Sequence, residues 1–353
     1  MENIKNIKNK EIIKPLNPLL KNEIFINKKI GNINNYNNYF NKIENYEKIL
    51  IGCLNEENNY LESINLLEKS NYYLINYNDK NYISLNIYLN SLLKKIYSNT
   101  DIETNTYIDI NNDTNENILK EYIFNIFEFY KNILYSLDLL IKNNIISNNI
   151  NINNLIYSKT NNNITINNFS YSFHISNNVI NNIHNLKILL KYIFKEENNK
   201  QNHYPFEFYI LNYLQENKLI GLSSNNIDLI YENYINNYPI YNILFKNNVL
   251  VYKNFKTNNL NYYYKLKNKN YEKLYEEFIK YSDTWDNVSL SSLYLNIIYN
   301  LNNLKEIKIL EQNEYLFSLL NRLKDLLIKN ISLIPNNRIK ISKNIELFEN
   351  LLF

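Results

Sequence analysis

The polar stretch 145–156 carries side chains that could do chemistry, and their type limits what that chemistry can be. Asn149, Asn151 and Asn154 lie here between two pairs of apolar residues. A carboxamide cannot accept a proton near pH 7, and it offers a hard cation such as Mg²⁺ only a neutral oxygen. These three side chains therefore suit hydrogen bonding better than general-base catalysis or strong metal binding.

A second group, Asn168-Phe169-Ser170, follows a short apolar run, and its polar side chains are also uncharged. No Asp or Glu occurs between Asp138 and Glu196. Neither group has a carboxylate close in sequence. The absence of a carboxylate between Asp138 and Glu196 is the strongest sequence argument against catalytic activity at this place in the chain.

Other metal-ligating and nucleophilic residue types are sparse. His174, His184 and His203 have no mutual spacing typical of a metal site, and we expect each to have a surface or packing role. Cys53 is the sole cysteine, so the chain can form neither an intrachain disulfide nor a thiolate zinc site. Its place in an apolar run predicts a buried, inert thiol.

The composition indicates a globular protein encoded by a very AT-rich genome. The chain has 353 residues, a net charge of +3 and 45% hydrophobic residues. This length is enough for a sizeable core, and the charge is not that of a strongly basic nucleic-acid binder. Alanine is absent, arginine occurs only as Arg322 and Arg338, and Asn, Ile, Lys and Tyr are abundant. Apolar residues alternate with the asparagines throughout, which favours a packed fold over disorder.

The chain contains no run of about 18 uncharged apolar residues, so we expect no transmembrane helix. Its first residues lack the apolar run of a signal peptide. We therefore expect a cytoplasmic protein.

The first quarter of the chain predicts a small mixed region. We expect a loosely ordered lead-in over 1–20 and a strand-rich part over 21–84, followed by a long region, 85–353, that is mostly helical and has a polar insertion over 97–116. Short runs rich in β-branched and aromatic residues predict strands. Within the first two parts we expect strands at 24–26, 49–51 and 72–75 and a helix at 61–67, and the spacing of apolar residues predicts a helix over 85–96.

The remainder of the chain carries the clearest periodicity. Residues 117–142 form the strongest predicted helix, with apolar residues three and four apart. The runs 155–157 and 164–166 predict a β-hairpin. The Tyr-rich stretch 237–268 is ambiguous. Further helices are expected over 178–195, 206–216, 224–235, 270–281, 288–303, 309–330 and 342–352.

This order of elements resembles that of the protein kinases, in which a strand-rich lobe precedes a helical one. The kinase catalytic loop reads H-R-D-L-K-x-x-N and is followed by a hairpin and D-F-G. By that resemblance Asn149 stands at the catalytic Asp position and Asn151 at the loop Lys position, while Asn154 retains the metal-binding Asn. Asn168 stands at the D-F-G Asp position, next to a retained Phe169.

Three strings in the second half extend the resemblance to the serine/threonine kinases of nucleocytoplasmic large DNA viruses. They are 203–210, 284–295 and 334–339, and the second contains the sole tryptophan. A plainer interpretation of the second string is that Asp286 caps the following helix and Trp285 packs in the core.

The resemblance is poor over 1–90. Gly31 is the one candidate remnant of a glycine-rich phosphate-binding loop. The strand lysine and helix glutamate of a kinase have several candidates here and no assignment: Lys42 or Lys48, with Glu47, Glu56 or Glu62.

The sequence thus predicts an α+β, protein-kinase-like bilobal fold with a reduced strand-rich N-lobe and a larger helical C-lobe. Three functions remain open: a catalytically inactive pseudokinase acting through partner binding, an active serine/threonine kinase, or an unrelated helical structural or virion protein. We expect either no cofactor or ATP that binds weakly at Asn154, Asn168 and Gly31. Mg²⁺ is expected at Asn154 and Asn168 only in an active kinase. We expect a protein partner, no nucleic acid and no membrane. If the chain is viral, we expect it in the cytoplasm of infected cells or in a virion.

Overall fold

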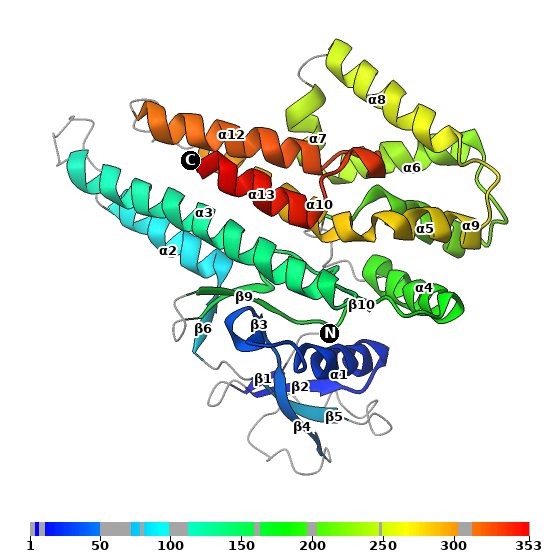
Figure 1. The fold of residues 1–353 in the computed structure, drawn as a ribbon, viewed down its shortest axis with the longest axis horizontal. Coiled ribbons are helices and arrows are strands. Elements are labelled where there is room, and N and C mark those ends of the chain that lie inside the picture. Colours follow the sequence, from blue (N-terminus) through cyan, green and yellow to red (C-terminus); the bar gives the residue numbers. More distant parts are fainter. Residues whose placement is uncertain are drawn as a thin grey trace.

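The structure, a computed structural model, has a mixed helix and sheet fold (Figure 1). It describes residues 4–6, 11–49, 72–77, 81–98, 112–158, 163–195, 203–246, 249–302 and 313–352. The predicted helix at 61–67, Cys53, Glu56, Glu62 and most of the predicted insertion at 97–116 lie outside these residues.

The first sheet has four antiparallel strands in the order β1-β2-β5-β4. Their bounds are β1 Ile4–Asn6, β2 Glu11–Pro15, β4 Ile43–Ile49 and β5 Tyr72–Tyr77. A small core of Leu20, Ile43, Ile75 and Tyr77 joins this sheet to the first helix. The strand predicted at 72–75 is confirmed by β5. Residues 11–20, predicted to be a loosely ordered lead-in, instead form β2 and the start of that helix.

Helix α1 extends over Pro18–Ile30, between β2 and β4 in the sequence. Its start is encoded locally, because the Asn17 side chain accepts a hydrogen bond from the backbone of Leu20 and Pro18 occupies the first turn. The strand predicted at 24–26 is therefore wrong. An apolar triplet fits either element, and here the capping signal and the burial of Ile26 and Ile30 decide for the helix.

A second sheet of four strands, in the order β3-β9-β8-β6, lies beside the long helix α3 in Figure 1. Strands β8 and β9 form the predicted antiparallel hairpin, with Ile156 paired to Thr165. The short strands β7 and β10 pair with each other. The bounds are β3 Phe40–Asn41, β6 Tyr82–Ser84, β7 Ile145–Ile146, β8 Leu155–Ser158, β9 Asn163–Asn167 and β10 Phe173–His174.

Helices make up most of the remaining chain. The predicted helices at 85–96 and 117–142 are confirmed as α2 and α3, and the ambiguous stretch 237–268 is largely helical. The helical elements are α2 Leu85–Ser98, α3 Asn112–Lys142, α4 Val179–Lys195, α5 Phe206–Glu216, α6 Ser224–Asn237, α7 Pro239–Tyr241, η5 Asn242–Lys246, α8 Val249–Tyr264, α9 Tyr271–Phe278, η6 Ile279–Thr284, α10 Trp285–Asn302, α12 Glu314–Asn330, η7 Pro335–Asn337 and α13 Ile341–Leu352.

One large apolar core joins α3 to the second sheet and to the C-terminal helices. Helix α3 contributes the fully buried Ile133, Leu134 and Leu137, and it contacts α2, α13, β7 and β9. Figure 1 shows α3 between the first sheet with α1 on one side and the helices α5 to α13 on the other. Among the described helices, none is long and apolar enough to cross a membrane.

Candidate functional site

The candidate site is the loop that connects β7 to β8, together with the segment that follows β9. In the loop, the Asn149 Nδ2 donates to the backbone oxygen of Asn168 at 3.0 Å, which ties the two segments together. The Asn151 Nδ2 donates to the Asn149 Oδ1 at 3.1 Å. Asn149 and Asn151 are both buried. The structure therefore brings Asn149, Asn151 and Asn168 together, with one hydrogen bond between two carboxamides and one from a carboxamide to the backbone.

Asn154 completes this network from the C-terminal end of the loop. Its Nδ2 donates to the backbone oxygen of Asn149 at 3.3 Å. The Asn151 Oδ1 accepts from the backbone nitrogens of Asn153 and Asn154, which turns the chain into β8. Asn151 thus shapes the loop, whereas a lysine at this position would present a charge.

Asn168 has a left-handed backbone conformation, with φ of 62°. Asparagine tolerates this region better than most residues. Its Oδ1 accepts from both the backbone nitrogen and the Oγ of Ser170, at 3.3 and 2.7 Å. The neighbouring Phe169 is fully buried and packs edge-on against Phe40. The oxygen that could face a metal ion is therefore already engaged.

Asp286 holds the other end of the loop. Its carboxylate oxygens accept from the backbone nitrogens of Ser147 and Asn148 at 2.7 and 2.8 Å. Burial raises the pKa of Asp286 to about 6, although the two backbone hydrogen bonds act to lower it. The predicted role of Asp286 as an N-cap is wrong, because the side chain serves a loop 138 residues earlier in the chain.

Sequence reasoning missed a buried cluster of polar side chains on the first sheet. The Lys14 Nζ donates to the Glu23 Oε2 at 2.7 Å and to the Tyr77 Oη at 2.9 Å. The Tyr77 Oη in turn donates to the Glu23 Oε1 at 2.8 Å, so the three groups form a closed triangle. Burial disfavours the charged form of Lys14 and so acts to lower its pKa. The interactions with Glu23 and Tyr77 together are larger than this effect, so the pKa of Lys14 is raised. The signal available in the sequence was the Asn17-Pro18 helix start, which places Glu23 on a helix directly after the strand of Lys14.

Of the lysines and glutamates that the sequence offered for a strand–helix ion pair, the described ones (Lys42, Lys48 and Glu47) do not join this cluster. The Lys42 Nζ lies over the Tyr36 ring at 4.6 Å, and Glu47 and Lys48 are exposed on β4. Gly31 directly follows α1, so it does not lie in a loop between two strands. The context required of a glycine-rich phosphate-binding loop is therefore absent at Gly31.

Helix α1 also reaches the segment after β9. The Asn22 Nδ2 donates to the backbone oxygens of Ser170 and Ser172 at 2.9 and 2.7 Å. Because Glu23 is the next residue, α1 contacts the buried lysine and the candidate site through neighbouring side chains.

The three strings from the second half of the sequence meet in space. Arg338 forms a buried two-pronged ion pair with Glu207, each nitrogen–oxygen distance being 2.7 Å. The Trp285 Nε1 donates to the same carboxylate at 3.3 Å, and the Trp285 ring packs edge-on against Phe208. The predicted packing of Trp285 in the core is confirmed.

Potential metal ligands do not gather anywhere in the described residues, where no group of three or more His, Cys, Asp or Glu is suitably placed. The Glu207 carboxylate is held by Arg338. His203 is buried, and His184 is exposed on α4.

Comparison with known proteins gives likeness to solved structures but none to known sequences. No protein-family model matches the chain, and no curated protein sequence matches it. The fold is similar to the crystal structure of the Mycobacterium tuberculosis PknI kinase domain, with a TM-score of 0.38 and 7% sequence identity, over 97% of this chain and 85% of that one. A likeness at this level says nothing about function. The function is therefore inferred from the contacts within the chain.

Proposed function

We propose that the chain is a protein-kinase-like protein that does not transfer phosphate and acts by binding a protein partner. The observation that carries this proposal is the bonding of Asn149 and Asn168 to each other and to their own loops. A kinase needs a carboxylate at the first position to accept the substrate proton and at the second to chelate Mg²⁺. Both positions have neutral side chains here.

The kinase-like part of the proposal is supported by contacts that the sequence did not predict. A strand lysine paired with a helix glutamate is a recurring part of kinases, and Lys14 of β2 pairs with Glu23 of α1. The loop that carries Asn149 lies between a long buried helix and a hairpin, as the resemblance requires. A viral source remains a proposal supported by the resemblance and the AT-rich composition.

The neighbouring carboxylates are not substitutes for the missing ones. Both Asp286 oxygens accept backbone hydrogen bonds, and the side chain is buried. Glu23 is fully buried and engaged by Lys14 and Tyr77. A proton acceptor must lie within hydrogen-bond reach of the group that it deprotonates, and neither side chain is free to do so.

An active serine/threonine kinase is the second candidate, and the Lys14–Glu23 pair is the observation that favours it. In kinases this pair orients the phosphates of ATP. Here the Lys14 Nζ is already shared between Glu23 and Tyr77, so a phosphate would have to compete with the tyrosine hydroxyl.

A phosphotransfer assay separates the two candidates. The purified chain is incubated with radiolabelled ATP, Mg²⁺ or Mn²⁺, and a basic protein substrate, beside an Asn154→Ala variant. We expect no incorporation above background for either protein. Incorporation by the wild-type chain that Asn154→Ala abolishes would overturn the proposal, because Asn154 is the metal-binding position that an active kinase would need.

A further inference from the structure

The outward side of α1 carries a stripe of positive charge around one exposed aromatic ring. Lys21, Phe25 and Lys28 are exposed at the i, i+4 and i+7 spacing that aligns residues on one side of a helix. Phe25 has 49% of its surface exposed. Lys29 lies beside it, with its Nζ 5.1 Å from the ring centre. We call these four residues the α1 face.

The charge of the α1 face is not balanced nearby on its own helix. Glu23 is the sole carboxylate of α1, and it is buried against Lys14 on the opposite side. In the part of the chain that the structure describes, Lys21, Lys28 and Lys29 form no ion pair. His174 packs edge-on against Phe25 and adds a titratable nitrogen base to the same neighbourhood.

Helix stability explains only part of this arrangement. Lysines in the last turn of a helix are favoured by the helix dipole, which accounts for Lys28 and Lys29. Lys21 is in the first turns, where the dipole disfavours a cation. Phe25 keeps half of its surface in water although α1 has apolar partners on its other side. Binding a partner would account for both exceptions.

We propose that the α1 face binds a helical protein segment that presents carboxylates to the lysines and one apolar side chain to Phe25. This inference rests on the proposed function in one respect, namely that the chain acts through a protein partner. Complementary charge would select the partner and speed its association, and the aromatic ring would supply the desolvated anchor.

Two observations favour an acidic helix over a nucleic acid. The residues follow one side of a single helix, which matches the ridge that a second helix presents along its length. Proteins that bind single-stranded nucleic acids instead use a positively charged groove with several aromatic rings on which successive bases stack. The α1 face has one exposed ring, and Lys29 already covers part of it.

The position of the α1 face connects it to the candidate site. Asn22 and Glu23, on the same helix, bond to the segment after β9 and to Lys14. A partner bound to α1 would therefore contact the helix that organises both groups of polar residues.

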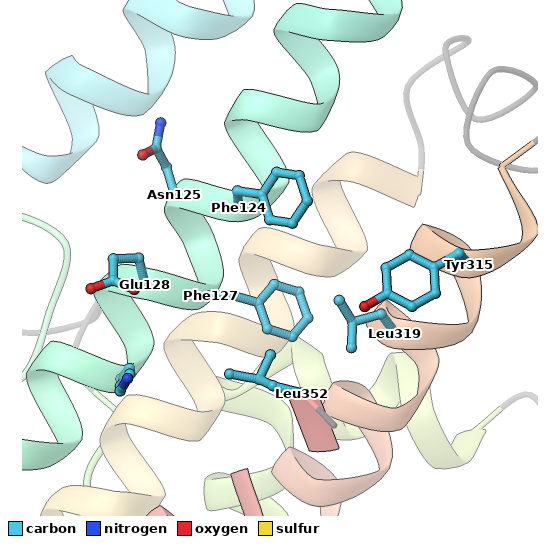
Figure 2. A pocket seen from close by; sticks show the side chains of 8 residues that line it. Phe124, Asn125, Phe127, Glu128, Tyr315, Leu319 and Leu352 are labelled. Carbon is cyan, nitrogen blue, oxygen red and sulfur yellow. The ribbon is translucent and has the colours of Figure 1, made fainter. Parts of the chain in front are cut away.

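A rival surface is the pocket of about 490 Å³ between α3, α12 and α13. Figure 2 shows Phe124, Phe127, Tyr315, Leu319 and Leu352 around it. Its charged lining is one glutamate and one lysine from the same helix, Glu128 and Lys131. This mixture selects no particular partner, so the pocket serves here as the comparison site.

The test uses fluorescence anisotropy with the full chain and three labelled probes. The first is a peptide of about 18 residues, long enough to form a helix, with Leu on one side and Glu on the others. The second has Lys in place of Glu, and the third is an oligo-thymidine strand. The first variant is the double substitution Lys21→Glu and Lys28→Glu, and the second is Phe25→Ala. The matched charge control is the double substitution Lys265→Glu and Lys267→Glu, at two other exposed lysines. Phe124→Ala reports on the rival pocket.

We expect the Glu peptide alone to bind, with an affinity that falls as salt is raised. The α1 double variant and Phe25→Ala should each weaken it by about tenfold or more, while the control pair and Phe124→Ala leave it unchanged. An equal melting temperature for all variants would show that the fold is retained.

Four results would overturn the inference: no binding of the Glu peptide at about 1 mM, equal weakening by the control pair, loss of binding with Phe124→Ala, or preference for the oligo-thymidine strand. None of these results bears on phosphate transfer, so failure here is distinguishable from failure of the proposed function.

Discussion

At the scale of single residues, His203 should make folding sensitive to acid. Burial lowers the pKa of His203 to about 4, from 6.5 in the unfolded chain. The neutral ring accepts a hydrogen bond from the Asn296 Nδ2 and lies on Tyr238. Its contribution to stability is therefore complete above pH 6.5 and is lost as the pH falls from 6.5 through 4.

Urea unfolding of the wild-type chain and a His203→Gln variant at pH 7 and 4.5 measures this effect. The variant should lose about 2 kcal/mol less stability than the wild-type chain between these pH values. Asp286 acts in the opposite direction, since its raised pKa makes the folded state less stable as the pH rises from about 4 to 6. Equal acid sensitivity of the two proteins would contradict the burial of His203.

At the scale of elements, the Glu207–Arg338 pair should be far more costly to break than an exposed ion pair. It joins the start of α5 to the segment before α13, and both side chains are almost fully buried. Arg338→Met would leave the Glu207 carboxylate buried without its partner, at a cost of about 3–5 kcal/mol in the free energy of unfolding. Glu232→Gln, which removes the carboxylate from the more exposed ion pair with Lys256, should cost less than about 1 kcal/mol. Similar costs for both variants would contradict this account.

Some of the helices and strands could be predicted from the sequence, and others could not. The helix at 117–142 and the hairpin were predictable because their apolar residues have a regular period and their partners are close in sequence. Helix α1 was not predicted because the apolar triplet Ile24-Phe25-Ile26 fits a strand as well as a helix, and the Asn17-Pro18 capping signal lies within the stretch assigned to the lead-in. The Lys14–Glu23–Tyr77 cluster was not predictable in the same way, since Tyr77 reaches it from 54 residues beyond Glu23.

For the candidate site, the sequence indicated which residues to compare and not the contacts that they make. Asn149 and Asn168 do meet, but the sequence could not show that each carboxamide is already bonded. The role of Asp286 depends on a contact between segments more than a hundred residues apart, which no local pattern encodes.

At the scale of the whole molecule, α1 and α10 connect the candidate site to the rest of the fold. Asn22 of α1 holds the segment after β9, and Asp286 of α10 holds the loop after β7. The loop that carries Asn149 lies between these two supports, and neither Asn149 nor Asn168 carries a carboxylate.

Under the proposed function, the site around Asn149 and Asn168 binds no nucleotide through a metal. The most direct measurement is a thermal-shift titration with ATP, with and without Mg²⁺ and Mn²⁺, since a ligand that binds the native state raises its melting temperature. The Asn168→Asp variant introduces a carboxylate metal ligand, and both Ser170 donors can still bond to it. Asn261→Asp makes the same chemical change at an exposed position on α8.

We predict no metal-dependent shift for the wild-type chain or Asn261→Asp, and a metal-dependent shift for Asn168→Asp alone. A metal-dependent shift of the wild-type chain would contradict the loss of the metal site. Failure of a well-folded Asn168→Asp to respond would contradict the kinase-like assignment of the site.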